Sequence, residues 1–152
     1  MSANAEEAVE MFGQGFNCAQ AVFASSGKRF GLARGTACHI AQAFGGGMCF
    51  LDQTCGAVTG ALMVIGLKHG KTTKDDAPRQ KAGQLSREFA RRFIAKHGSL
   101  RCTELLGCDL SKPKGVDQAR ALGLFRKICP KLVGDATEIV DQLLEDEEKL
   151  SP

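Results

Sequence analysis

The sequence contains no tryptophan and no tyrosine, and proline occurs at only four positions. Phenylalanine, with nine residues, is therefore the only aromatic residue that can fill the core. Phenylalanine can stack on bases, but a net charge of +3 over 152 residues does not by itself indicate nucleic-acid binding. We therefore expect no nucleic-acid partner.

Long apolar runs are also lacking. The longest covers the 13 residues 55–67, whereas a membrane-spanning helix needs about 20. The first seven residues are polar and acidic, without the basic and apolar regions of a secretory signal. These features predict no membrane insertion and a cytoplasmic location.

Cysteine is abundant instead, with seven residues. A chain of this length buries about 70% of its unfolded surface, so it needs no disulfides to fold as a single domain, residues 1–152. In a reducing compartment, clustered thiols more often bind metal or carry out redox chemistry than form structural disulfides. The cysteines are therefore the candidate functional residues.

The pattern of apolar residues predicts an all-α fold, because no stretch alternates with a period of two. Asn17 is a candidate N-cap for a second helix, and Gly45, Gly46 and Gly47 are expected to end a third. Asp135 is expected to cap the last helix. The predicted helices cover residues 3–12, 18–28, 36–44, 54–68, 77–96, 103–106 and 116–124, with a final helix from 135.

The predicted helix over residues 54–68 is apolar nearly all round, which is typical of a helix at the centre of a bundle. Gly56, Gly60 and Val64 recur every four residues along it. This stripe of small residues would let a neighbouring helix approach closely. We therefore expect a compact, single-domain helical bundle around a buried, glycine-striped helix.

Two cysteines are expected at helix N-termini, where free N–H groups lower a thiol pKa. Cys18 follows Asn17, and Cys55 opens the glycine-striped helix, so both are candidate catalytic thiols. Gly56 and Gly60 would leave room beside Cys55 for a metal, a cofactor or a substrate. Against this, free cysteine is among the most buried residue types and often serves only as a small hydrophobe.

Other motifs carry weaker signals. Cys49 and Cys55 have the same spacing as Cys102 and Cys108, so the two pairs could build a four-thiolate site, but this spacing exceeds that of most zinc sites. The sequence Lys-His-Gly at 68–70 and 96–98 is typical of a helix end. The three consecutive glycines could bind an anion, although a chain turn with close packing is the simpler interpretation.

Several of these strings together resemble the redox-active family named for its C-GCAxxG-C-C cysteine pattern. The resemblance extends over about residues 5–144, and its core string here begins Cys-Gly-Ala rather than Gly-Cys-Ala. The matching strings are Phe16-Asn17-Cys18-Ala19-Gln20-Ala21, Phe44-Gly45-Gly46-Gly47, Cys55-Gly56-Ala57-Val58-Thr59-Gly60 with Gly66-Leu67, Cys102-Thr103-Glu104-Leu105-Leu106-Gly107, and Cys129.

By position, this resemblance implies a site made of Cys18, Cys55, Cys102 and Cys129, and it leaves Cys38, Cys49 and Cys108 without a role. It implies thiol or iron–sulfur redox chemistry, in an oxidoreductase or an electron carrier with an electron donor or acceptor as its partner. The family is also similar to part of the split-Soret cytochromes, which carry an iron–sulfur centre beside their haems. The present sequence has no C-x-x-C-H motif, so we expect no c-type haem.

Four thiolates could hold an iron–sulfur cluster, which is our leading interpretation. Alternatively, Cys55 could be a low-pKa attacking thiol with a resolving partner among the other three. Two further hypotheses remain: a helical binding or assembly module with reduced, packed cysteines, in which the glycine-striped helix joins a homodimer, and a structural zinc protein.

Overall fold

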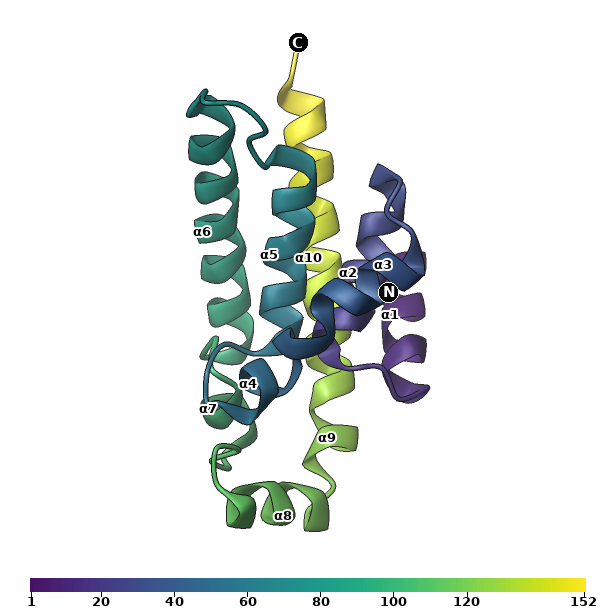
Figure 1. Cartoon of the computed structure of the whole chain (residues 1–152), viewed down its shortest axis with the longest axis vertical. Helices are drawn as coiled ribbons and strands as arrows, with labels where there is room; N and C mark the ends of the chain where they lie inside the picture. The colour runs from purple at the N-terminus through teal and green to yellow at the C-terminus, as the bar shows by residue number, and fades with distance from the viewer.

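A computed structural model describes residues 1–152 and confirms the all-α prediction (Figure 1). Its only non-helical pairing is an isolated antiparallel bridge between Thr54 and Arg101. None of the helices combines the length and apolar character needed to cross a bilayer. The helices are α1 (Ala3–Gly13), α2 (Cys18–Gly27), α3 (Arg34–Ala41), α4 (Gly45–Phe50), α5 (Gly56–His69), α6 (Ala77–His97), α7 (Cys102–Leu106), α8 (Pro113–Ala121), α9 (Leu124–Lys127) and α10 (Cys129–Leu150), with 3-10 turns η1 (Lys28–Phe30) and η2 (Gln42–Phe44).

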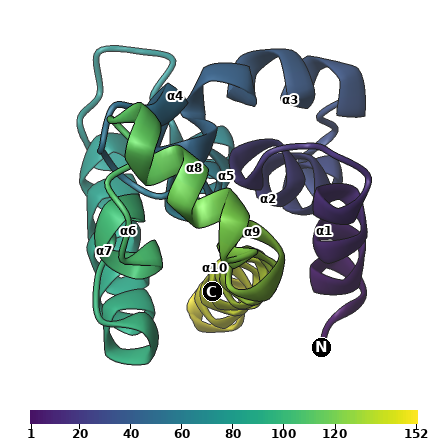
Figure 2. The same cartoon turned by 90° about the horizontal axis from the view of Figure 1, so that it is seen from below.

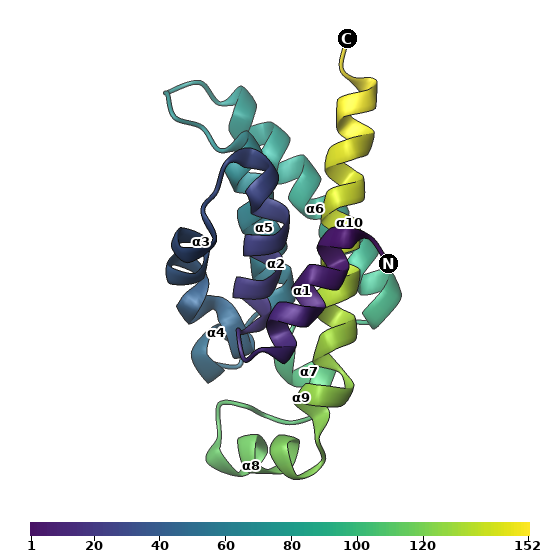
Figure 3. The same ribbon diagram turned by 90° about the vertical axis from the view of Figure 1, so that its right-hand side faces the viewer.

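Helix α5 lies at the centre, between α6 and α10 on one side and α2 on the other (Figures 1 and 3). Its buried residues include Gly56, Gly60 and Val64, as the predicted stripe requires. Helix α6 contributes Phe89 and Phe93, which are fully buried with their ring centroids 5.8 Å apart. Burial of large apolar side chains such as these is the main source of stability of the fold, and each contributes about 2 kcal/mol or more.

Helix α2 is the most completely buried element, since all ten of its residues are buried. Small side chains such as Ala19, Ala21 and Ser25 allow this position between α1, α3 and α5. The predicted Asn17 cap forms a complete capping box, in which the Asn17 side chain accepts from Gln20 N and the Gln20 side chain accepts from Asn17 N, both at 2.9 Å. This cap fixes where α2 begins, and therefore where Cys18 lies.

Two predicted helix starts are wrong. Helix α10 begins at Cys129, and Asp135 lies inside it, where it pairs with Lys96 and Lys131. Proline breaks a helix when it stands in the interior. Pro130 instead stands in the first turn of α10, where the backbone N–H that proline lacks would have no helical partner. The same holds for Pro113, which starts α8 three residues before the predicted start at residue 116.

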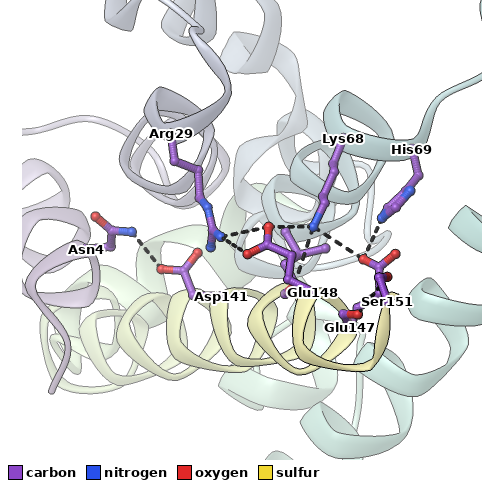
Figure 4. Close-up of polar contacts among 9 residues, drawn as sticks. Asn4, Arg29, Lys68, His69, Asp141, Glu147, Glu148 and Ser151 are labelled. Atoms are coloured by element: carbon purple, nitrogen blue, oxygen red, sulfur yellow. Dashed lines mark hydrogen bonds and ion pairs between the residues drawn. The ribbon is translucent and has the colours of Figure 1, made fainter.

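The far end of α10 is held by ion pairs (Figure 4). Glu147 contacts Lys68 and His69 at the end of α5, the latter with 2.7 Å between the His69 Nε2 and a Glu147 carboxylate oxygen. Glu148 pairs with Lys68 at 2.7 Å and with Arg29 at 3.2 Å. The acidic end of the chain is thus bound to the ends of other helices. His69 and Gly70 end α5 as predicted for a Lys-His-Gly sequence.

Candidate functional site

Four cysteines open four different helices at the lower end of the bundle (Figure 1). Cys18, Cys102 and Cys129 are the first residues of α2, α7 and α10, and Cys55 is the N-cap of α5. All four side chains are buried, with exposed fractions between 2% and 7%. The structure therefore brings together the four residues that the family resemblance singled out.

Local backbone structure positions each of them. The bridge between Thr54 and Arg101 sets Cys55 and Cys102 side by side. Its hydrogen bonds run from Cys55 N to Leu100 O at 2.8 Å and from Cys102 N to Gln53 O at 3.1 Å. Cys18 is positioned by the capping box and Cys129 by the first turn of α10. The site is therefore assembled from segments far apart in the sequence.

The four thiols line one cavity of about 430 Å³. No lysine, arginine, histidine, aspartate or glutamate side chain lines it. Negative charge inside this cavity can therefore be compensated only by N–H groups, from the helix N-termini and from the side-chain amides of Asn17 and Gln42. The lining residues are Phe12, Asn17, Cys18, Gln42, Gly45, Gly46, Cys49, Phe50, Cys55, Cys102, Leu106, Phe125, Cys129 and Leu132.

Part of the cavity wall is an unusual left-handed turn. In α4, Gly46, Gly47, Met48 and Cys49 have φ values of 66°, 69°, 62° and 55°. For Met48 and Cys49 this conformation costs about 1–2 kcal/mol per residue. Strain of this kind persists where the surrounding structure enforces it, and it often occurs at functional sites.

The consecutive glycines explain how this turn fits. A Cβ on Gly45 would lie 2.3 Å from the Asn17 side chain, and one on Gly47 would lie 2.9 Å from the Cys102 Cβ. The glycines therefore allow α4 to contact the start of both α2 and α7. Turning and close packing, the simpler of the two interpretations of this motif, account for all three positions.

The electrostatics of the thiols differ from the prediction. Burial raises the pKa of Cys55 to about 11, although the N–H groups of Ala57 and Val58 act in the opposite direction. The predicted low pKa at Cys55 is therefore wrong, because desolvation outweighs the helix N-terminus. Burial also raises the pKa of Cys102, and the negative charge of a neighbouring Cys55 thiolate raises it further.

Cys18 and Cys129 behave as a pair. A hydrogen bond with Cys129 raises the pKa of Cys18, helped by burial, and the same bond lowers the pKa of Cys129 despite its burial. The Cys129 thiolate is thus the best stabilised of the buried ones. The expectation of a low pKa at Cys18 is wrong, because the hydrogen bond with Cys129 and burial both raise it.

Gly56 and Gly60 do not provide space for a cofactor. A Cβ on Gly56 would lie 2.8 Å from Gly45 Cα and 3.0 Å from Ala19 N, and one on Gly60 would lie 2.9 Å from Ala19 O. Neither glycine lines the cavity. Their role is the close contact between α5 and α2, and the space beside the thiols comes from α4, α9 and α10.

The structure adds Cys49 as a fifth thiol of the cavity wall, and its side chain is exposed. Cys49 belongs to the left-handed turn, which the sequence signals only as three consecutive glycines. Cys108 is buried but does not line the cavity, and Cys38 is half-buried in α3. The alternative site made of Cys49, Cys55, Cys102 and Cys108 is therefore not formed.

All seven cysteines are reduced thiols. No three cysteine, histidine or carboxylate side chains converge closely enough to surround one metal ion. The four thiols instead surround a volume. Thiolate sulfur is the ligand type preferred by iron–sulfur clusters and by zinc.

Comparison with known proteins gives the family. No curated protein matches the sequence, and no solved structure matches the chain. The family model described as "Putative redox-active protein (C_GCAxxG_C_C)" matches residues 16–143, which include all four buried cysteines of the cavity. Since this match covers most of the 152 residues, the chain belongs to the C_GCAxxG_C_C family of redox-active proteins.

Proposed function

We propose that this protein is a one-electron carrier in which Cys18, Cys55, Cys102 and Cys129 hold an iron–sulfur cluster. The observation that carries the proposal is that four buried thiols, each at the N-terminal end of its own helix, line one cavity. A cluster bound there would supply one-electron redox chemistry. The chain's own part is to hold the ligands, exclude water and stabilise negative charge.

The donor set fits such a group. Thiols with a raised pKa are poor nucleophiles at neutral pH, because they stay protonated. They are nevertheless suitable ligands, since a bound metal cation replaces the proton and supplies the charge that the apolar wall lacks. Cys55 and Cys102 have this character, whereas the nucleophile that the sequence predicted at Cys55 would need a lowered pKa.

The surroundings also suit a group that carries negative charge. The N-terminus of a helix bears about half a positive charge, and the helices that begin at Cys18, Cys55 and Cys129 are each ten residues or longer. Phe12, Phe125 and Leu132 on the cavity wall restrict access of water. An uncharged, mostly apolar wall with N–H groups is the kind of environment that tunes cluster potentials.

The proposal is tested by purification without oxygen, followed by a visible spectrum and by iron, sulfide and zinc analysis. We expect visible absorbance with stoichiometric iron and sulfide, lost in Cys55→Ser. Cys108→Ser is the matched control, because Cys108 is equally buried but lies outside the cavity, and it should retain iron and colour. A colourless protein with zinc would instead support the structural zinc hypothesis, and a metal-free protein would rule out both.

A second candidate function rests on the pair Cys18 and Cys129. Both line the same cavity, and their opposite pKa shifts favour a dithiol/disulfide couple in which the Cys129 thiolate is the attacking sulfur. Oxidation would join the two sulfurs and release two electrons and two protons to a two-electron acceptor. We therefore assign this role to Cys129 and Cys18 rather than to Cys55.

The couple is tested on metal-free protein by treatment with diamide, which accepts the two electrons and two protons. Peptide mapping should find a Cys18–Cys129 disulfide, unchanged in Cys55→Ser. A disulfide that involves Cys55 or Cys49 instead would refute this assignment. If no disulfide forms and no metal is bound, a binding or assembly module with packed, reduced cysteines is the hypothesis that remains.

A further inference from the structure

The positive charge of this protein is unevenly neutralised. Twelve of the 20 lysine and arginine side chains form an ion pair with a carboxylate. The other eight have no carboxylate partner, and four of these lie on α8 and α9. The eight are Arg34, Lys74, Arg87, Lys114, Arg120, Arg126, Lys127 and Lys149.

These four residues, Lys114, Arg120, Arg126 and Lys127, are all exposed. The only carboxylate on α8 and α9 is that of Asp117, so these two helices keep an excess of positive charge. By contrast, the acidic second half of α10 is partly neutralised by Arg29, Lys68, Lys81 and Arg92. The two ends of the molecule therefore differ in charge, and the positive end is the one formed by α8 and α9.

The same end carries the cysteine cavity. Figure 2 looks up at this end, where α8 leads through α9 into α10. Phe125 of α9 lines the cavity, and Lys127 lies two residues before Cys129. Half of the unpaired cations therefore lie on the two helices that lead into the redox site.

Exposed apolar side chains occur on the wall of the same cavity and between α8 and α9. Phe50 and Leu51, in and after α4, are 41% and 65% exposed, and Leu122, between α8 and α9, is 50% exposed. Apolar side chains with a polar rim, and an enrichment in phenylalanine and arginine, are typical of a surface that binds another protein. Nucleic acid would instead need a longer basic stripe or aromatic stacking platforms.

We propose that the surface formed by Lys114, Arg120, Arg126 and Lys127, with Phe50, Leu51 and Leu122, docks an acidic redox protein. The inference rests on the proposed electron-transfer function, because it names the kind of partner that exchanges electrons with that site. Charge complementarity would steer an acidic protein to this end and accelerate the encounter. A partner seated here is separated from the four thiols by the wall that Phe50 and Phe125 form.

The test compares two triple variants that remove the same charge. Lys114→Gln, Arg120→Gln and Arg126→Gln together neutralise the proposed surface. Lys74→Gln, Arg87→Gln and Lys149→Gln together remove three equally exposed, unpaired cations outside it. The net charge falls from +3 to zero in both, so bulk charge cannot distinguish them.

The probe is an acidic plant-type [2Fe–2S] ferredoxin, whose binding is measured by titration at low ionic strength. We expect the first triple variant to lose about tenfold or more in association rate, and the second to stay within about twofold of the unmodified protein. Equal losses in both variants, no loss in the first, or no binding by the unmodified protein would overturn the inference. So would tighter binding of single-stranded RNA or of anionic lipid vesicles than of the ferredoxin.

This result is separable from the outcome for the cluster itself. Binding of the ferredoxin needs no metal in the present protein, whereas the spectrum and the iron analysis need no partner. Dithionite, a small reductant, should reduce any bound centre equally in both triple variants. Loss of ferredoxin binding together with normal dithionite reduction would therefore place the effect at the docking surface.

Discussion

The contact between α2 and α5 gives the most direct test of the fold. In Gly60→Ala, the new Cβ would lie 2.9 Å from Ala19 O, 3.0 Å from Val22 Cβ and 3.2 Å from Ala19 Cα. Both neighbours are fully buried, so α2 has little room to move away. Overpacking of this kind costs about 1–3 kcal/mol.

The same helix offers a matched control. In Gly66→Ala, the new Cβ meets nothing within 4 Å. Alanine is favoured over glycine inside a helix by about 1 kcal/mol, and this gain applies to both variants. The difference between their unfolding free energies therefore isolates the clash, and we expect it to be about 1–3 kcal/mol, with Gly66→Ala the more stable.

Urea unfolding followed by circular dichroism measures this difference, provided that the slopes of the transitions agree. Equal stability of the two variants would refute the close approach of α2 and α5. A second measurement links the contact to the site. Ala19 follows Cys18, so Gly60→Ala should also lower the iron content per chain, and Gly66→Ala should not.

Three further predictions concern single side chains. Glu147 has a lowered pKa because, although burial raises it, the hydrogen bond from His69 and the charges of Lys68 and Lys81 outweigh that effect. As the pH drops below the ordinary pKa of 4.5, the unfolded chain takes up the proton first, so the free energy of unfolding should fall. Glu147→Gln should be less stable at pH 7, and its free energy of unfolding should fall less steeply in acid, as measured by urea unfolding at several pH values. Iodoacetamide should modify Cys49 before the five buried cysteines of the folded, metal-free protein, as followed by mass spectrometry; earlier modification of Cys55 would contradict the described cavity. Cys108→Ala should lose about 1 kcal/mol of stability in thermal unfolding without losing iron, and loss of iron there would show that Cys108 belongs to the site.

Local signals in the sequence were sufficient for most helices. The start of α2 follows from Asn17 and Gln20, whose capping box needs no other part of the chain. Likewise, Gly98 ends α6 with a φ of 87°, as a Lys-His-Gly sequence predicts. The prediction failed at Pro113 and Pro130, because proline breaks a helix interior but also begins helices, and only the rest of the fold decides between the two.

The identities of the four site cysteines came from the resemblance to the family, not from spacing. Cys18, Cys55, Cys102 and Cys129 are too far apart in the sequence for any local rule to group them. The one grouping that spacing suggested, which included Cys108, is excluded because Cys108 lies outside the cavity. Convergence of the four requires α2, α5, α7 and α10 to begin at the same end of the molecule.

By itself, the sequence determined the helical class, the cap of α2 and the small-residue stripe of α5, because these depend on neighbours three or four residues apart. Only the tertiary structure decided the chemistry of the thiols. Burial raises the pKa of Cys55, which its place at a helix start was expected to lower, and the approach of Cys18 lowers the pKa of Cys129. Likewise, Cys49 joins the cavity only because α4 turns left-handed against Asn17 and Cys102. Desolvation and contacts between distant segments exist only once the chain is folded, so no local pattern encodes them.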